Sequence, residues 1–167
     1  MAEINVAAAV TESAEITTPI LQTIMEFLNS SIAQDGEPVC PCEVLFERMT
    51  DKGLSMAIQQ SSSGLPNRYD QNIVGSYTVD LPFNVYISIS AKASADRIGA
   101  IMVLDRIGSF FTAQTKNKTL PMLGDGLKAL KIETTGRPVM SDTDENSREC
   151  YGAEYTLSYR HLSEYER

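Results

Sequence analysis

The sequence predicts an α+β fold, with a mostly antiparallel β-sheet and two helices packed on one face of it. The first observation is an alternation of apolar and mixed residues from Leu81 to Ile89, which is typical of a strand with one buried face. The second is a run of apolar residues at helical spacing from Ala100 to Phe111, which indicates a helix that covers a sheet. Strand patterns outnumber helical ones elsewhere, so we expect the helices to shield one face only.

Length and composition indicate a single folded domain. The chain has 167 residues, of which 43% are hydrophobic, and this content is enough for a sizeable core. We expect residues 1–14 to form a mobile acidic N-terminal arm and residues 15–167 to form one α+β domain.

The first helix is predicted to begin at Thr17 or Thr18, with Pro19 at its first position, and to end at Asp35. Its buried stripe is predicted to consist of Ile20, Leu21, Ile24, Phe27, Leu28 and Ile32. A hairpin is predicted over residues 39–60. The turn of this hairpin is Asp51-Lys52-Gly53, and Cys40, Cys42, Val44 and Phe46 share one face of its first strand.

The polar segment 59–72 is predicted to be a loop that is functional or mobile, because it is longer than ordinary connections, and residues 115–126 are predicted to be a second loop. The helix between them is predicted over Ser94–Gln114, with Ser94 as its cap. After the second loop we expect a strand near residues 127–133, a polar turn region at 136–148 and a last strand, rich in tyrosine, from Tyr151 to Arg160.

The net charge of −8 is confined to the N-terminal part of the chain. Eight carboxylates and no Lys or Arg precede Arg48, whereas the residues from Arg48 onward carry 14 basic and 14 acidic side chains. Wrapping of nucleic acid requires clustered Lys and Arg, and the sequence has no such cluster. We therefore interpret the acidic part as a solvated surface that aids solubility.

The sequence offers no place for catalysis, a cofactor or a metal. Its only histidine, His161, lies six residues from the C-terminus, and its three cysteines, Cys40, Cys42 and Cys150, do not have the spacing of a zinc site. The acidic cluster at 142–145 has no central Gly or terminal Glu at the positions that a calcium loop needs. We expect a non-enzyme from a reducing compartment, with no secretory signal and no membrane span.

Several short motifs carry a resemblance to a known family. They are Tyr69-Asp70, a Gly followed by a long alternating strand (Gly75 to Ile89), Phe110-Phe111, Leu120-Pro121, the Tyr-rich strand Tyr151 to Tyr159, and a Thr-Pro helix with Ile20, Leu21 and Ile24. Over residues 17–160 this order resembles the small "minor capsid" or tail-terminator proteins of tailed bacteriophages.

The resemblance implies a structural virion protein. Such a protein forms a ring, expected to be a hexamer, that caps the tail tube at its head-proximal end, stops polymerisation of the tube and joins the tail to the neck. Its implied partners are copies of itself, the tail tube protein, neck or connector proteins and, if the tail is contractile, the sheath protein. DNA would pass through without specific binding. Its implied location is the tail or neck of the virion, after assembly in the cytoplasm of the bacterial host.

A closed ring needs head-to-tail contacts and a channel. Candidates for the channel-facing acids are Glu37, Glu43 and Glu47. Candidates for the inter-subunit loops are Arg68, Tyr69, Lys116 and Lys118.

Two other interpretations remain open. The chain could be a tail tube subunit or another neck or tail-completion subunit, and a tube subunit would form long tubes rather than rings in electron micrographs. It could also be a small cytoplasmic α+β ligand-binding domain or enzyme. A deep apolar pocket with a bound metabolite would favour this second alternative.

Overall fold

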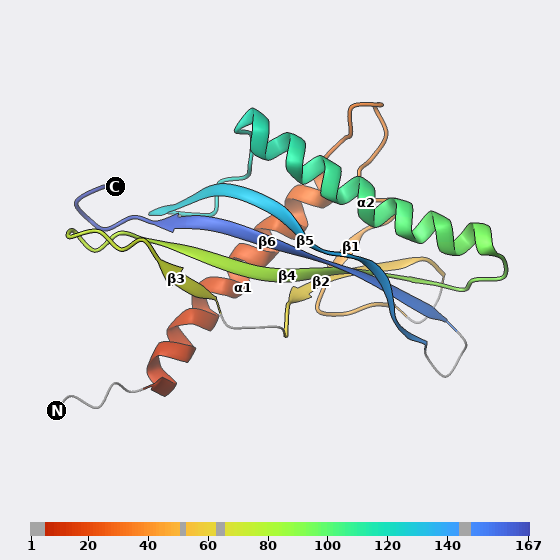
Figure 1. Ribbon diagram of the computed structural model, residues 1–167, viewed down its shortest axis with the longest axis horizontal. Helices are drawn as coiled ribbons and strands as arrows, with labels where there is room; N and C mark the ends of the chain where they lie inside the picture. Colours follow the sequence, from red (N-terminus) through yellow and green to blue (C-terminus); the bar gives the residue numbers. More distant parts are fainter. Residues whose placement is uncertain (1–5, 51–52, 63–65, 144–147) are drawn as a thin grey trace.

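The computed structural model describes residues 6–50, 53–62, 66–143 and 148–167, and it shows a six-stranded sheet with two long helices (Figure 1). In chain order the elements are α1 (Val6–Ser30), β1 (Val44–Phe46), β2 (Ser55–Gln60), β3 (Asn67–Tyr69), β4 (Tyr77–Ile89), α2 (Ser94–Asn117), β5 (Leu127–Thr143) and β6 (Glu149–His161).

The strands lie in the order β1-β2-β4-β6-β5, and β3 also pairs with β4. Every pairing is antiparallel except that of β1 with β2, which is parallel. The central pair, β4 and β6, stays in register without interruption from Tyr77 opposite His161 to Ile89 opposite Glu149. The predicted α+β class with a mostly antiparallel sheet is confirmed.

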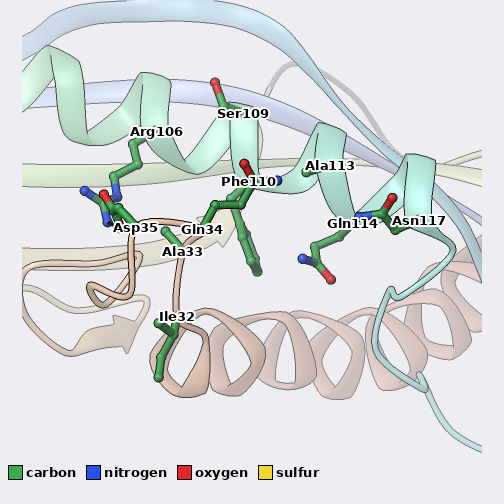
Figure 2. A pocket seen from close by; sticks show the side chains of 10 residues that line it. All are labelled: Ile32, Ala33, Gln34, Asp35, Arg106, Ser109, Phe110, Ala113, Gln114 and Asn117. Atoms are coloured by element: carbon green, nitrogen blue, oxygen red, sulfur yellow. Dashed lines mark hydrogen bonds and ion pairs between the residues drawn. The ribbon is translucent and has the colours of Figure 1, made fainter.

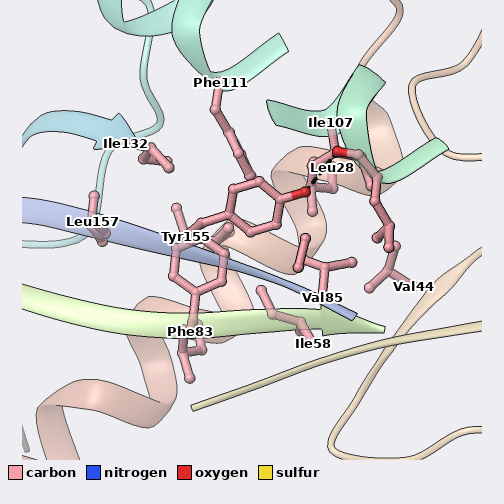
Figure 3. Packing of buried hydrophobic residues seen from close by; sticks show 14 of the residues in the cluster. Leu28, Val44, Ile58, Phe83, Val85, Ile107, Phe111, Ile132, Tyr155 and Leu157 are labelled. Atoms are coloured by element: carbon pink, nitrogen blue, oxygen red, sulfur yellow. Dashed lines mark hydrogen bonds between the residues drawn. The ribbon is translucent and has the colours of Figure 1, made fainter. Parts of the chain in front are cut away.

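Both helices pack on the same face of the sheet, where the hydrophobic core lies. Phe83 of β4 and Tyr155 of β6 are opposite each other in the register, and both rings contact Phe111 of α2, with ring centroids 6.0 and 5.3 Å from that of Phe111 (Figure 3). The buried hydroxyl of Tyr155 donates a hydrogen bond of 2.7 Å to the carbonyl of Leu104 in α2. Phe27 of α1 contacts a second ring of α2, so the helices also pack on each other.

The first helix begins at Val6, and the prediction that it begins at Thr17 or Thr18 is wrong. The segment around Ala7 and Ala9 has high helix propensity and continues the helix toward the N-terminus. Pro19 therefore lies inside the helix, where it removes one backbone hydrogen bond. Of the predicted arm, residues 1–5 lie outside the described residues, and residues 6–14 are helical.

The prediction of a hairpin at 39–60 is also wrong, because β1 is short and runs parallel to β2. The position of β1 is set by α1. The Asn29 side-chain amide bonds both the backbone N–H of Val44 (2.7 Å) and its carbonyl (3.0 Å). The chain then turns at Glu47, which has a left-handed φ of 53°. Cys40 and Cys42 precede the strand, and two residues of the predicted turn, 51 and 52, lie outside the described residues.

Two short strands share one side of β4, and Pro82 lies in the gap between them. β2 pairs with β4 up to Phe83, and β3, which occupies part of the predicted loop at 59–72, pairs from Asp80. The carbonyl of Pro82 accepts a hydrogen bond from the backbone of Ser61 on that side. A proline has no N–H to donate, and a gap in the ladder is where a central strand tolerates it.

The strand β5 continues to Thr143, so the prediction of a turn region at 136–148 is wrong for residues 136–143, while 144–147 lie outside the described residues. β5 is an edge strand with four shifts of register against β6, and these irregularities break the alternation that marks a strand in sequence. At Gly136 a Cβ would lie 2.9 Å from that of Glu154, so the two strands approach too closely there for any side chain.

The predicted helix at 94–114 is confirmed and extends to Asn117, and its cap is Ala93 rather than Ser94. The carboxylate of Asp96 accepts hydrogen bonds from the backbone N–H groups of Lys92 and Ala93, and these bonds lower the pKa of Asp96. At the other end Lys118 adopts a left-handed conformation, with φ 57°, which ends the helix.

Candidate interaction surfaces

Within the part of the chain that the structure describes, no group of three or more His, Cys, Asp or Glu side chains lies close enough to hold a metal ion. The two acids of the 142–145 cluster that follow Thr143 lie outside that part. Neither described helix combines the length and apolar character that crossing a membrane requires.

The cysteine thiols are poorly suited to nucleophilic chemistry. Burial raises the pKa of Cys40 to about 12, with a smaller contribution from the neighbouring Cys42. Burial is also the largest cause of the raised pKa of Cys42 and of Cys150. A thiol must lose its proton to act as a nucleophile, and burial disfavours this loss at all three cysteines.

The first hollow on the surface lies between the segment after α1 and the side of α2 that faces α1, and it has a volume of about 390 Å³ (Figure 2). Phe110 lines it from α2, and Ile32, which is 66% exposed, lies at its rim. The guanidinium of Arg106 forms an ion pair of 2.9 Å with Asp35 and also bonds the carbonyl of Glu37. Because the one cation that lines this hollow is already paired, it is a poor site for an anionic ligand.

The second hollow, which we call the loop groove, lies between the segment after α2 and the start of β5. Its volume is about 510 Å³. It is lined by Lys118, Leu120, Pro121, Met122, Leu127, Lys128, Ala129 and Leu130. Apolar side chains therefore form most of the lining. The only charges among the lining residues are two positive ones.

At one end of the sheet a tight turn, residues 72–76, presents apolar side chains to solvent. Ile73 is fully exposed and Val74 is 38% exposed. The Asn72 carboxamide oxygen accepts hydrogen bonds from the N–H groups of Val74 (3.2 Å) and Ser76 (2.9 Å), and the backbone of Asn72 accepts a third from Gly75. The turn is thus fixed by its own hydrogen bonds.

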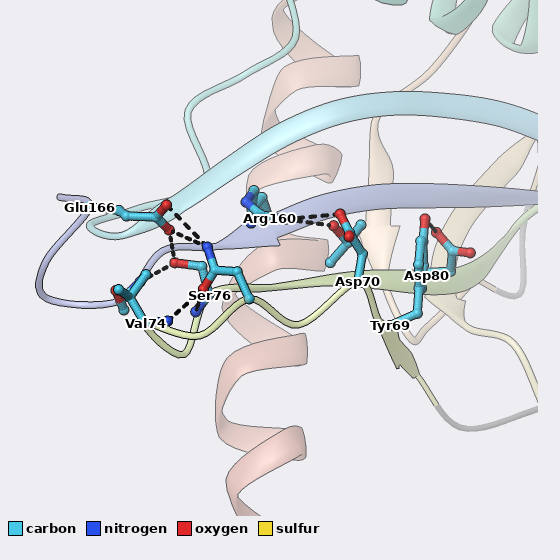
Figure 4. Close-up of polar contacts among 10 residues, drawn as sticks. Tyr69, Asp70, Val74, Ser76, Asp80, Arg160 and Glu166 are labelled. Atoms are coloured by element: carbon cyan, nitrogen blue, oxygen red, sulfur yellow. Dashed lines mark hydrogen bonds and ion pairs between the residues drawn. The ribbon is translucent and has the colours of Figure 1, made fainter.

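The C-terminal segment fastens the same turn from the side (Figure 4). The Glu166 carboxylate accepts hydrogen bonds from the Asn72 amide and the Ser76 hydroxyl, and these bonds lower its pKa. The Ser76 hydroxyl also accepts the N–H of Ser163 at 2.9 Å. Tyr165, next in the chain to Glu166, is 87% exposed. We call the turn and this segment, which expose Ile73, Val74 and Tyr165, the apolar tip.

The predicted loop residues Arg68 and Tyr69 lie on β3, on opposite faces of the sheet. Arg68 lies over the ring of Tyr77, 4.8 Å from its centroid, and His161 stacks on the same ring at 4.8 Å. β3 and β6 flank β4, so the Tyr77 ring lies between the guanidinium of Arg68 and the imidazole of His161. The hydroxyl of Tyr69 instead donates to Asp80 across the pair of strands (3.1 Å).

The other predicted site residues do not gather at one place. Lys116 lies in the last turn of α2, and Lys118 ends that helix. Glu37, Glu43 and Glu47 are all exposed along the segment that links α1 to β2. Whether these three acids face a channel stays a prediction.

The exposed apolar residues of the tip and the loop groove were not among the sequence candidates. Ile73-Val74 lies between Asn72 and Gly75, which are favoured at the first and last positions of a β-turn, and this frame is a signal that the pair sits at a turn surface. No comparable signal marks Met122 or Tyr165, whose exposure of 90% and 87% depends on the tertiary structure.

No protein-family model matches this chain, and a search of curated proteins finds no significant match to it.

Proposed function

We propose that this chain is the subunit of a tail-terminator ring, which closes the head-proximal end of a bacteriophage tail tube and joins it to the neck. The proposal rests on the resemblance over residues 17–160 and on one structural observation. Large apolar side chains are exposed outside the core, with Ile73, Met122 and Tyr165 each at least 87% exposed.

Exposed apolar side chains of this kind are typical of surfaces that other proteins cover. Ile73 and Tyr165 line neither of the two hollows described above, and Met122 lines the loop groove. This distribution favours an assembly subunit over a ligand-binding domain, which buries most of its ligand in a concave site.

Electron microscopy and native mass spectrometry of the purified protein, alone and with tail tube protein, test the proposal. We expect closed rings, and tubes of the partner protein that stop growing when the ring is added. Long tubes made of this chain alone would instead identify a tube subunit. A monomer that carries a metabolite, and that has no effect on tube growth, would favour the ligand-binding alternative.

The channel-facing acids are tested separately. Reversal of Glu37, Glu43 and Glu47 to Lys is expected to leave rings intact, because all three side chains are exposed, and to slow DNA ejection, because a positive channel attracts phosphates. Infectivity and ejection kinetics measure the effect.

The matched control reverses three exposed acids elsewhere, Asp105, Asp125 and Asp142, with the same change in net charge. Normal ejection by the first variant, or equal slowing by both, would rule out a specific role for the three N-terminal acids.

A further inference from the structure

One end of the sheet face that the helices leave open is covered by the chain between β1 and β2. Ser55 of β2 is opposite Ser88 of β4, and both side chains point away from the core, since their neighbours Met56 and Ile87 lie in it. Yet Ser55 is 3% exposed and Ser88 is 6% exposed. The cover consists of residues 47–50 and 53–54, which we call the strap.

A hollow of about 190 Å³ lies between part of the strap and the sheet. Its lining from the strap is Glu47, Arg48 and Met49, and its lining from the sheet is Ala57, Gln59, Tyr86 and Cys150. Cys150 of β6 is opposite Ser88, so its thiol lies on the open face beneath this part of the chain. The accessibility of Cys150 therefore depends on the position of the strap.

The strap is held from across the sheet by Arg148, which directly precedes β6. This side chain is 5% exposed, and its guanidinium donates hydrogen bonds to the carbonyls of Thr50 (2.7 Å) and Gly53 (2.6 Å). The planar guanidinium presents its N–H groups in a fixed fork, so one side chain holds two carbonyls in a defined geometry. Both bonds are charge-assisted, which makes them stronger than ordinary neutral ones.

The strap itself buries little apolar surface. Glu47 and Thr50 are exposed, and Leu54 is 42% exposed. Two further hydrogen bonds attach it to β2, from the N–H of Thr50 to the Ser55 hydroxyl (2.8 Å) and from the N–H of Glu47 to the carbonyl of Ile58 (2.9 Å). A segment with little apolar burial opens locally at a lower free energy than the strands of the core.

We propose that the strap opens as a local unit while the sheet stays folded, and that Arg148 is the latch that keeps it closed. Opening uncovers the floor of the hollow, at Ala57, Tyr86 and Cys150. This device belongs to the fold of the single chain, so it does not depend on the proposed ring.

Alkylation with iodoacetamide, followed by mass spectrometry of the peptides, measures the opening. Cys150 reports on the strap, and Cys40, which is 7% exposed in the core, reports on unfolding of the whole domain. Arg148→Met removes both bonds of the latch. It should raise the rate at Cys150, relative to that at Cys40, by roughly tenfold or more, because hydrogen bonds from charged groups are the strong ones. Arg148→Lys keeps the charge without the fork and should give a smaller rise.

The matched control is Arg97→Met. Arg97 of α2 forms an ion pair of 2.8 Å with Glu149, the residue after the latch, on the face that the helices cover. This variant loosens the start of β6 and removes no bond to the strap, so the ratio of the Cys150 and Cys40 rates should stay near that of the natural chain. An equal rise in both Arg→Met variants would show that Cys150 is exposed by fraying of β6, and would overturn the strap.

Ser55→Ala tests the strap without a change of charge, and it serves also if Arg148→Met does not fold. It removes the acceptor of the Thr50 N–H. Hydrogen exchange measured by NMR should then be faster at the N–H of Glu47 and unchanged at that of Ile87 in the central strand β4. Exchange at Glu47 that is no faster than in the natural chain, in Ser55→Ala and in Arg148→Lys alike, would overturn the proposal.

Discussion

The two faces of the sheet are built from alternate residues of the same strands, yet they are held together differently. On the face that the helices cover, rings and aliphatic side chains pack closely, as at Phe83 and Tyr155. On the other face, polar side chains bond across the strands. Asp80 accepts hydrogen bonds from Tyr69 and from Ser158 (2.6 Å).

The two faces therefore contribute differently to the free energy of unfolding. The covered face supplies hydrophobic burial, which is the dominant favourable term in folding. Each hydrogen bond on the open face adds little to the free energy of unfolding. Together these bonds pair polar groups that are partly buried, such as Asp80 and Ser158. Changes on the covered face should therefore have larger effects on the free energy of unfolding.

The largest effect is expected at two neighbouring residues of β4 that point to opposite faces. Phe83→Ala should lower the free energy of unfolding by about 3–5 kcal/mol, because it leaves a cavity beneath Phe111 and Tyr155. Asn84→Ala, on the open face, should change it by no more than about 0.5 kcal/mol. Urea denaturation measures both, and equal effects would contradict the contrast between the faces.

A second test uses two glycines of α2. At Gly108 a Cβ would lie 2.6 Å from the hydroxyl oxygen of Thr134 in β5, so Gly108→Ala should lower the free energy of unfolding by about 1–3 kcal/mol. Gly99 has open space around it. Gly99→Ala should raise this free energy by about 0.5–1 kcal/mol, because Ala is the better helix former. Thermal unfolding of the two variants should thus give shifts of opposite sign, and shifts of the same sign would show that the helix does not press on β5.

On the open face, Asp80→Ala should lower the free energy of unfolding by about 1–2 kcal/mol. It removes the acceptor of the Ser158 hydroxyl, which is buried, and of the Tyr69 hydroxyl. Tyr69→Phe is the control, since it removes one hydrogen bond and leaves Ser158 paired. If the two variants unfold at the same urea concentration, the buried hydroxyl does not depend on Asp80.

The smallest effect is expected at the start of β6, where Glu149 bonds to α2, and it depends on pH. Hydrogen bonds from Arg97 and then from the hydroxyl of Tyr151 lower the pKa of Glu149 below its ordinary value of 4.5. A lowered folded-state pKa adds stability above the unfolded value, and this stability is lost as the pH falls through the folded value. Glu149→Gln should therefore flatten the fall in melting temperature below about pH 4.5. A parallel fall in the natural chain and the Glu149 variant would exclude this role.

The sequence predicts the covered face well and the edges poorly. β4 and the middle of α2 have long, regular periods because one side of each is buried there, as at Val85 and Ile107. β5 contacts a partner on one side only, and its shifts of register remove the alternation, so its second half looked like a turn. The parallel pairing of β1 depends on Asn29, a residue of α1 that is distant in sequence, and no local pattern encodes such a contact.

The candidate surfaces follow the same rule. The turn at Asn72–Gly75 could be inferred from its residue types, because Asn and Gly have local conformational preferences. The loop groove could not, since Met122 and Leu130 form it only after α2 and β5 come together.

The irregular edge of β5 has a consequence for how copies of this chain behave at high concentration. A long, straight strand at the edge of a sheet recruits identical strands and leads to fibres. Here 17 residues of edge strand are interrupted by four shifts of register and carry Pro138, Lys128 and Lys131. Such an edge has no even row of donors and acceptors for another strand to copy. Open-ended growth through the β5 edge of the sheet is therefore disfavoured when the protein is concentrated.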